Sequence, residues 1–120
     1  MADIEGVDFV TLLVRDLEAA YEFYAVKLGL TESSEKRPGA HAFSMKPVSL
    51  AIRHVPGNRK VDNPGQGIIV WLRTSDSTAL YTELKERGVP IVEELRTSPF
   101  GMTFSFRDPD GYVLGVHDAG

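Results

Sequence analysis

Apolar and polar residues alternate along several short stretches of the chain, and two longer stretches carry apolar residues at helical spacing. Residues 7–14 and 68–73 alternate with a period of two, which predicts β-strands. After each of these strands the apolar period lengthens to three or four residues, which predicts one helix over residues 17–28 and another before Gly88. Asp16 is the expected N-cap of the first helix, and either Ser75 or Ser77 is that of the second.

The rest of each half reads as three further strands. In the first half they are expected at residues 30–37, 41–46 and 48–54, and in the second half from residue 90 to 94 and on both sides of a turn at residues 108–111. Pro109 and Gly111 favour that turn, because proline presets φ and glycine tolerates a positive φ. A polar loop is expected at residues 96–99. Both halves therefore have the order β-α-β-β-β.

The two halves align as an internal repeat. The offset is 60 residues over the first strand and helix, 61 at the third strand, where Phe43-Ser44 meets Phe104-Ser105, and 64 at the last strand. We therefore predict an α+β fold in which residues 1–120 form a single domain of two tandem modules. The first βαβββ module spans residues 6–55, a linker rich in turn formers spans 56–66, and the second βαβββ module spans 67–118.

Composition and charge narrow the possible functions. The chain has 120 residues, no cysteine and a formal charge of −4, which argues against nucleic acid as a partner and against disulfides or thiol catalysis. No apolar run approaches the ~20 residues needed to cross a bilayer, so no membrane association is predicted. The first residues have no features of a secretory signal, and a cytoplasmic location is the default expectation.

Three segments resemble a known family. Residues 10–17, with Phe23-Tyr24 and residues 28–30, resemble the first module of the vicinal oxygen chelate superfamily, which includes glyoxalase I, extradiol dioxygenases and bleomycin-resistance proteins. Residues 108–112, Asp-Pro-Asp-Gly-Tyr, look like the second-module signature. The resemblance implies two modules that curl into a half-open barrel around a cleft, a homodimer, and in the enzymes a divalent metal held by one side chain from each of four strands.

The positions of the family's metal ligands carry no donor atoms here. Carried over onto this sequence, they fall on Phe9, Ile69, Ala51 and Gly115. A register shifted by one residue would place Asp8, Ile68, Ile52 and either Leu114 or Val116 there, which offers one ligand at most. We therefore predict no metal, no cofactor and no catalytic residues.

The predicted cleft suits a small molecule. Its expected ligand-binding residues share the parity of those four positions and are Phe9, Thr11, Ala51, Arg53, Ile69, Trp71, Gly115 and His117. In the third strand of each module, parity leaves open whether Ser44 and Ser105 or Phe43 and Phe104 face inward. Phe100 and Met102 could form an apolar lip. His41 and His54 are expected near solvent, at the start and the end of a strand.

Three functions remain open. The first is a metal-independent, bleomycin-resistance-like protein that sequesters a bulky aromatic or cationic small molecule in the cleft between its modules. The second is a glyoxalase- or dioxygenase-like enzyme, a lyase or oxidoreductase, with a displaced metal or with acid–base chemistry by His117 and Arg53. The third is a structural or regulatory dimer whose cleft is filled by side chains.

Overall fold

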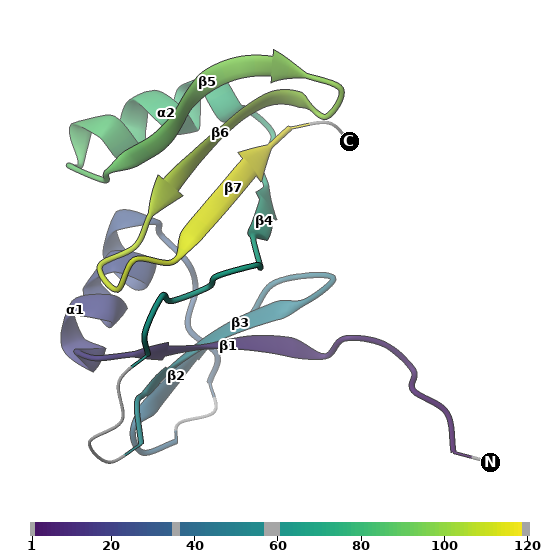
Figure 1. Cartoon of the computed structure of the whole chain (residues 1–120), viewed down its shortest axis with the longest axis vertical. Coiled ribbons are helices and arrows are strands. Elements are labelled where there is room, and N and C mark those ends of the chain that lie inside the picture. The colour runs from purple at the N-terminus through teal and green to yellow at the C-terminus, as the bar shows by residue number, and fades with distance from the viewer. Residues whose placement is uncertain (1, 35–36, 57–60, 119–120) are drawn as a thin grey trace. The chain divides into compact units, whose positions relative to one another are not determined.

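The chain folds into two units, each with its own sheet and helix (Figure 1). The computed structural model describes residues 2–34, 37–56 and 61–118. The units span Met1–Val61 and Asp62–Gly120, so the division lies inside the predicted linker, of which residues 57–60 are outside the described residues. The predicted α+β class is confirmed. Within the described ranges, no helix is both long and apolar enough to cross a membrane.

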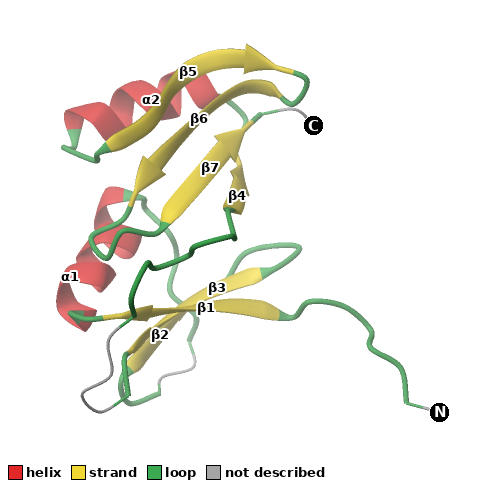
Figure 2. Cartoon of the chain, viewed as in Figure 1, coloured by secondary structure: helices red, strands yellow, loops and turns green. Residues whose placement is uncertain are grey.

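The first unit has a three-stranded sheet (Figure 2). Its elements are β1 (Phe9–Val14), α1 (Leu17–Tyr21), the π-helical segment η1 (Glu22–Lys27), β2 (Ala40–Phe43) and β3 (Ser49–His54). The strand order is β1-β3-β2, with β1 parallel and β2 antiparallel to β3. The expected cap is confirmed, because the Asp16 carboxylate accepts a hydrogen bond from the Ala19 amide at 3.1 Å.

The strand predicted at residues 30–37 is wrong as far as the structure describes that segment. It forms only two isolated bridges, Glu32 to Phe43 and Arg37 to Ala40, and residues 35–36 lie outside the described residues. Two backbone hydrogen bonds, from Ser33 to Ala42 and from Ser44 to Thr31, still hold it beside β2. After Leu30 the segment has no apolar side chain until the proline at 38, so it has nothing to bury as a regular strand would.

The second unit has a four-stranded sheet in the order β4-β7-β6-β5. Its elements are β4 (Val70–Arg73), α2 (Ser77–Glu86), β5 (Ile91–Ser98), β6 (Gly101–Arg107) and β7 (Val113–His117), and α2 packs against β5 and β6 (Figure 2). Two expectations are corrected. The cap of α2 is Asp76, whose carboxylate accepts from the Ala79 amide at 3.0 Å, and not Ser75 or Ser77. Residues 96–98 continue β5 and pair with β6.

The turn before β7 is organised by one carboxylate. Asp108 is 4% exposed, and its Oδ1 accepts from the amides of Asp110, Gly111 and Tyr112, each at 2.9 Å. Gly111 has a φ of 103°, which confirms the expected use of glycine there. The turn therefore fixes where β7 begins, and with it which residues of β7 face each side of the sheet.

Each sheet buries the face that carries its large apolar side chains. Leu12, Val14, Leu50 and Ile52 are buried in the first unit, and Leu114 and Val116 occupy the matching strands of the second. Phe43 and Phe104 are also buried, and their rings lie 6.1 Å from Tyr24 and 5.3 Å from Tyr81, both helical residues. The open parity question is thereby answered: the phenylalanines face the core, and Ser44 and Ser105 have the opposite parity.

The strand register agrees with most of the internal repeat. Val10 pairs with Leu50 in the first unit and Val70 with Leu114 in the second, which reproduces the offsets of 60 and 64. The third-strand offset of 61 is wrong. Ala42 pairs with Ala51, and Ser105 pairs with Gly115, so the structural offset there is 63. Matching the Phe-Ser dipeptides by identity misplaced the inserted residues: three precede the third strand and one follows it.

Candidate functional site

The open face of each sheet, defined as the face turned away from that unit's own helix, carries most of the residues predicted to bind a ligand. In the first unit two rows of neighbouring side chains cross this face, Thr11–Ala51–Ala42 and Leu13–Arg53–Ala40. Phe9 pairs with Ser49 at the start of β1 and is 57% exposed. The first open face is therefore built mainly from small or apolar residues, with one guanidinium.

The open face of the second unit has the same register but different chemistry. Its two rows are Trp71–Gly115–Ser105–Glu93 and Arg73–His117–Thr103–Arg96. Trp71 is 49% exposed although it lies in the sheet, and Ile69, just before β4, is 53% exposed. An aromatic ring with half its surface in solvent can bind another ring by stacking.

Gly115 is covered by the indole ring of Trp71. A Cβ atom built on Gly115 would lie 2.7 Å from Cε3 and from Cζ3 of that ring, closer than real Cβ contacts. The absence of a side chain at residue 115 is therefore what allows the ring to lie this close to the strand. Glycine at residue 115 therefore leaves the space that the Trp71 ring occupies.

His117 contacts two exposed aromatic residues. Its ring centroid is 6.3 Å from that of Trp71 and 6.4 Å from that of Phe100, both in edge-to-face geometry. Phe100 is 60% exposed in the turn between β5 and β6. His117 Nδ1 is buried and has no hydrogen-bond partner, and the same holds for Oγ1 of Thr103, the residue directly opposite on β6.

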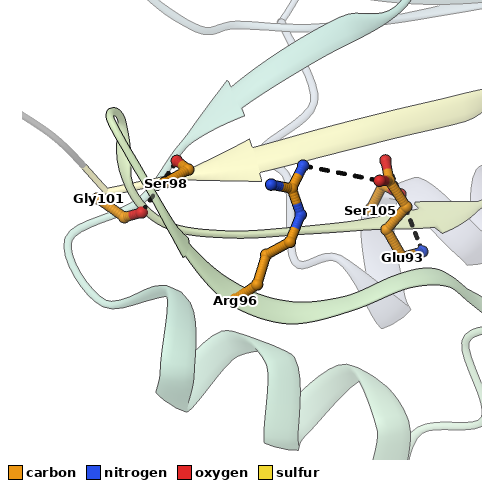
Figure 3. Close-up of polar contacts among 5 residues, drawn as sticks. All are labelled: Glu93, Arg96, Ser98, Gly101 and Ser105. Carbon is orange, nitrogen blue, oxygen red and sulfur yellow. Dashed lines mark hydrogen bonds and ion pairs between the residues drawn. The ribbon is translucent and has the colours of Figure 1, made fainter.

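In the row that contains Trp71 and Gly115, the polar side chains of Ser105 and Glu93 already have partners within the protein (Figure 3). The Ser105 hydroxyl accepts from the Glu93 amide at 3.1 Å and donates to Glu93 Oε1 at 3.5 Å. Arg96 Nη2 lies 3.6 Å from Glu93 Oε2, and both of these side chains are more than half exposed. Such an ion pair adds little stability in water, and the Ser105 hydroxyl is held by its own two hydrogen bonds to Glu93.

Asp118, directly after β7, hydrogen-bonds to two other elements of the second unit. Its two carboxylate oxygens accept from the amides of Ser77, at 3.1 Å, and Met102, at 2.9 Å. These backbone donors, that of Ser77 first, hold the pKa of Asp118 below its ordinary value of 3.8. The ionised carboxylate thus ties the start of α2 to the start of β6.

The residues at the implied metal positions do not fit a divalent ion. Phe9, Ile69, Ala51 and Gly115 have no donor atoms, and the space above Gly115 holds the indole ring. The alternative register is also unsuitable, since Ile52, Leu114 and Val116 point into the core. Among the described residues, no three His, Asp or Glu side chains gather closely enough to hold a metal.

The predicted site residues divide between the two units. Phe9, Thr11, Ala51 and Arg53 belong to the first sheet, and Ile69, Trp71, Gly115 and His117 to the second. Sequence reasoning missed Thr103, because the third-strand parity was undetermined and only its pairing with His117 brings it to the site. The suggested partnership of Phe100 with Met102 is altered: Met102 is half-buried in β6, and Phe100 lies beside His117.

The other two histidines lie away from the open faces. His54 ends β3 and is exposed, as expected. His41 is not simply near solvent, because its side chain is 29% exposed, its Nδ1 lies 2.6 Å from Glu32 Oε2, and its ring centroid is 4.4 Å from that of Tyr21. His41 therefore packs against α1 and contacts Glu32, on the side of the sheet that faces the helix.

Comparison with known proteins gives a consistent result. The family model described as Glyoxalase/Bleomycin resistance protein/Dioxygenase superfamily matches residues 6–116. Among curated protein sequences, none matches significantly.

Three solved structures illustrate the likeness. TnmS3, an antibiotic binding protein from Streptomyces sp. CB03234, is 26% identical with a TM-score of 0.74, and 100% of each chain is covered. UcmS2 is 26% identical with a TM-score of 0.79, covering 97% of this chain and 99% of that one. A glyoxalase/bleomycin resistance protein from Streptomyces sp. CB03234 is 26% identical with a TM-score of 0.72, covering 94% of this chain and 100% of that one.

Proposed function

The chain belongs to the glyoxalase/bleomycin resistance protein/dioxygenase superfamily, and from that premise we propose that it is a metal-independent small-molecule-binding protein. Its ligand is a bulky aromatic or cationic compound, which the protein sequesters without converting it. The family and an antibiotic-binding relative support the general function of small-molecule binding. The absence of a metal requirement and the class of ligand are the parts proposed for this chain.

One observation carries the proposal: an exposed tryptophan lies over the strand position from which a metal-binding side chain would project. Trp71 covers Gly115 and leaves half its own surface in solvent. Binding by such a surface needs only shape, stacking and a few hydrogen bonds, and no group that changes protonation state during turnover. The exposed Phe100 and Ile69 add apolar area on the same unit.

Titration of glycopeptides and other aromatic natural products, with neutral and cationic members, tests the proposal directly. Trp71 is the only tryptophan, so its fluorescence reports on this surface alone. We expect at least one compound to bind with an affinity that chelators leave unchanged. Trp71→Ala should weaken that binding about tenfold when followed by calorimetry, since stacking on an aromatic ring contributes roughly 1 kcal/mol beyond buried area.

Val26→Ala is the matched control, because Val26 is also a large exposed apolar residue but lies on η1, outside both open faces. It should leave the affinity unchanged. An affinity that disappears with chelator and returns with a divalent metal would refute the metal-independent part. A complete lack of binding across the panel would refute the function itself.

A further inference from the structure

Two buried polar atoms without partners belong to neighbouring residues on the second unit's open face. Thr103 is 2% exposed, and its Oγ1 makes no hydrogen bond; the same is true of the buried His117 Nδ1. The two residues are directly opposite across β6 and β7, an arrangement that brings Cβ atoms to roughly 5 Å from one another. Unpaired buried polar atoms are rare in native proteins, and two at adjacent positions call for a physical explanation.

Ser105 shows what an ordinary buried hydroxyl does on this strand. It lies two residues from Thr103 with the same parity, and its Oγ both accepts from and donates to Glu93 (Figure 3). Arg96, the residue paired with Thr103, is instead directed to Glu93 and leaves the threonine hydroxyl unused. Glu93 on β5 thus satisfies the hydroxyl of Ser105, whereas no group of the described residues satisfies that of Thr103.

Keeping a hydroxyl at residue 103 is unfavourable for the free protein. Valine has the same branched shape and would fill the position without leaving a polar atom unpaired, so the hydroxyl weakens the fold. A residue that lowers stability in this way is explained if a bound molecule completes its hydrogen bonds. The two exposed rings beside His117, Trp71 and Phe100, indicate that this molecule is aromatic.

We propose that Thr103 and His117 form a hydrogen-bonding subsite for a hydroxyl group attached directly to an aromatic ring. A phenol-type hydroxyl donates one hydrogen bond and accepts others, so it can donate to a neutral imidazole nitrogen and accept from a threonine hydroxyl. Its ring would then lie against the exposed rings of Trp71 and Phe100. This subsite rests on the proposed function and adds to it the chemical class of group that the ligand must carry.

The test compares two probes, 2-naphthol and 2-methoxynaphthalene, which differ in that only the first can donate a hydrogen bond. We expect the wild-type protein to bind 2-naphthol about tenfold more tightly, the difference that one hydrogen bond to a buried site provides. Thr103→Val and His117→Phe should each abolish this preference. Thr97→Val is the matched control: its hydroxyl lies on the same hairpin but contacts Met102 Sδ, and the preference should survive.

Thermal unfolding gives a second readout. Thr103→Val should raise the Tm of the free protein by about 4 °C, because the unpaired hydroxyl is removed without a change of shape. His117→Phe tests the subsite independently if the valine variant folds poorly.

The outcomes separate the two proposals. Equal affinity of the wild-type protein for both probes, or a preference that persists in Thr103→Val and His117→Phe, overturns the subsite. So does binding of the natural-product panel without binding of either probe, and in these cases the proposed function stands. Failure to bind the panel and both probes overturns the subsite and the function together.

Discussion

The two units have the same scaffold and strand register, but their open faces differ in chemistry. Thr11 and Ala51 in the first unit become Trp71 and Gly115 in the second. The neighbouring pair Arg53 and Ala40 becomes His117 and Thr103, again at matching register positions. What the units share lies in their buried strand pairs and in the aspartates that cap their helices. In both units the large apolar core residues lie on one parity of the paired strands, and the chemical differences between the units lie on the other.

The largest expected effect concerns the turns that lead into the last strand of each unit. Asp108→Ala should cost about 3 kcal/mol, because three amides, two part-buried and one buried, lose a charged acceptor. In the first unit the corresponding turn has long contacts between Ser49 Oγ and the Met45 backbone, at 3.3 and 3.4 Å, so Ser49→Ala should cost about 0.5 kcal/mol or less. Urea denaturation of both variants measures the difference, and equal losses would contradict it.

A second prediction exchanges a row between the units. Gly115→Ala places the first unit's residue beneath Trp71 and should cost about 2 kcal/mol, since the new methyl group and the ring cannot share the space. The double variant Trp71→Thr with Gly115→Ala carries the first unit's residues at both of these positions and should recover most of that loss. Chemical denaturation of the single and double variants gives the coupling. Additive losses would show that the ring does not determine the residue at 115.

The smallest expected effect concerns the ends of β3 and β7, and it is present near neutral pH and lost in acid. The folded pKa of Asp118 is below its ordinary value of 3.8, so its contribution to stability is complete above about pH 5 and is lost as pH falls through the folded pKa. Asp118→Asn should therefore lower Tm near neutral pH, and its difference from wild type should shrink below pH ~4. At the repeat offset of 64, the counterpart of Asp118 in the first unit is His54, which is exposed at the end of β3. His54→Asn should leave the fall of Tm below pH ~4 unchanged.

Much of the fold could be predicted from the sequence because local signals and burial agree. Alternation located β1, β3 and β7, and the Asp16 cap and the glycine turn at residue 111 were read from residue type. The cap of α2 was misassigned because Ser75, Asp76 and Ser77 are all good capping residues, and only backbone geometry distinguishes them.

The candidate site was less predictable because it depends on pairing between strands distant in sequence. The parity of Trp71 and His117 followed from the alternation, but Thr103 did not, since both faces of β6 carry residues that are buried. That the Thr103 hydroxyl lacks a partner while that of Ser105 has one depends on the bulged register of β5, which no local pattern encodes.

The contact between Trp71 and Gly115 also constrains the order in which this protein could change. A carboxylate cannot be introduced at residue 115 while the indole keeps its place, because even the first carbon of its side chain would overlap the ring. A lineage moving toward a metal-binding relative would have to lose the tryptophan first, and with it the ring proposed to hold the present ligand. The intermediate would then neither stack a ligand on Trp71 nor hold a metal, so selection for either activity would oppose the passage between them.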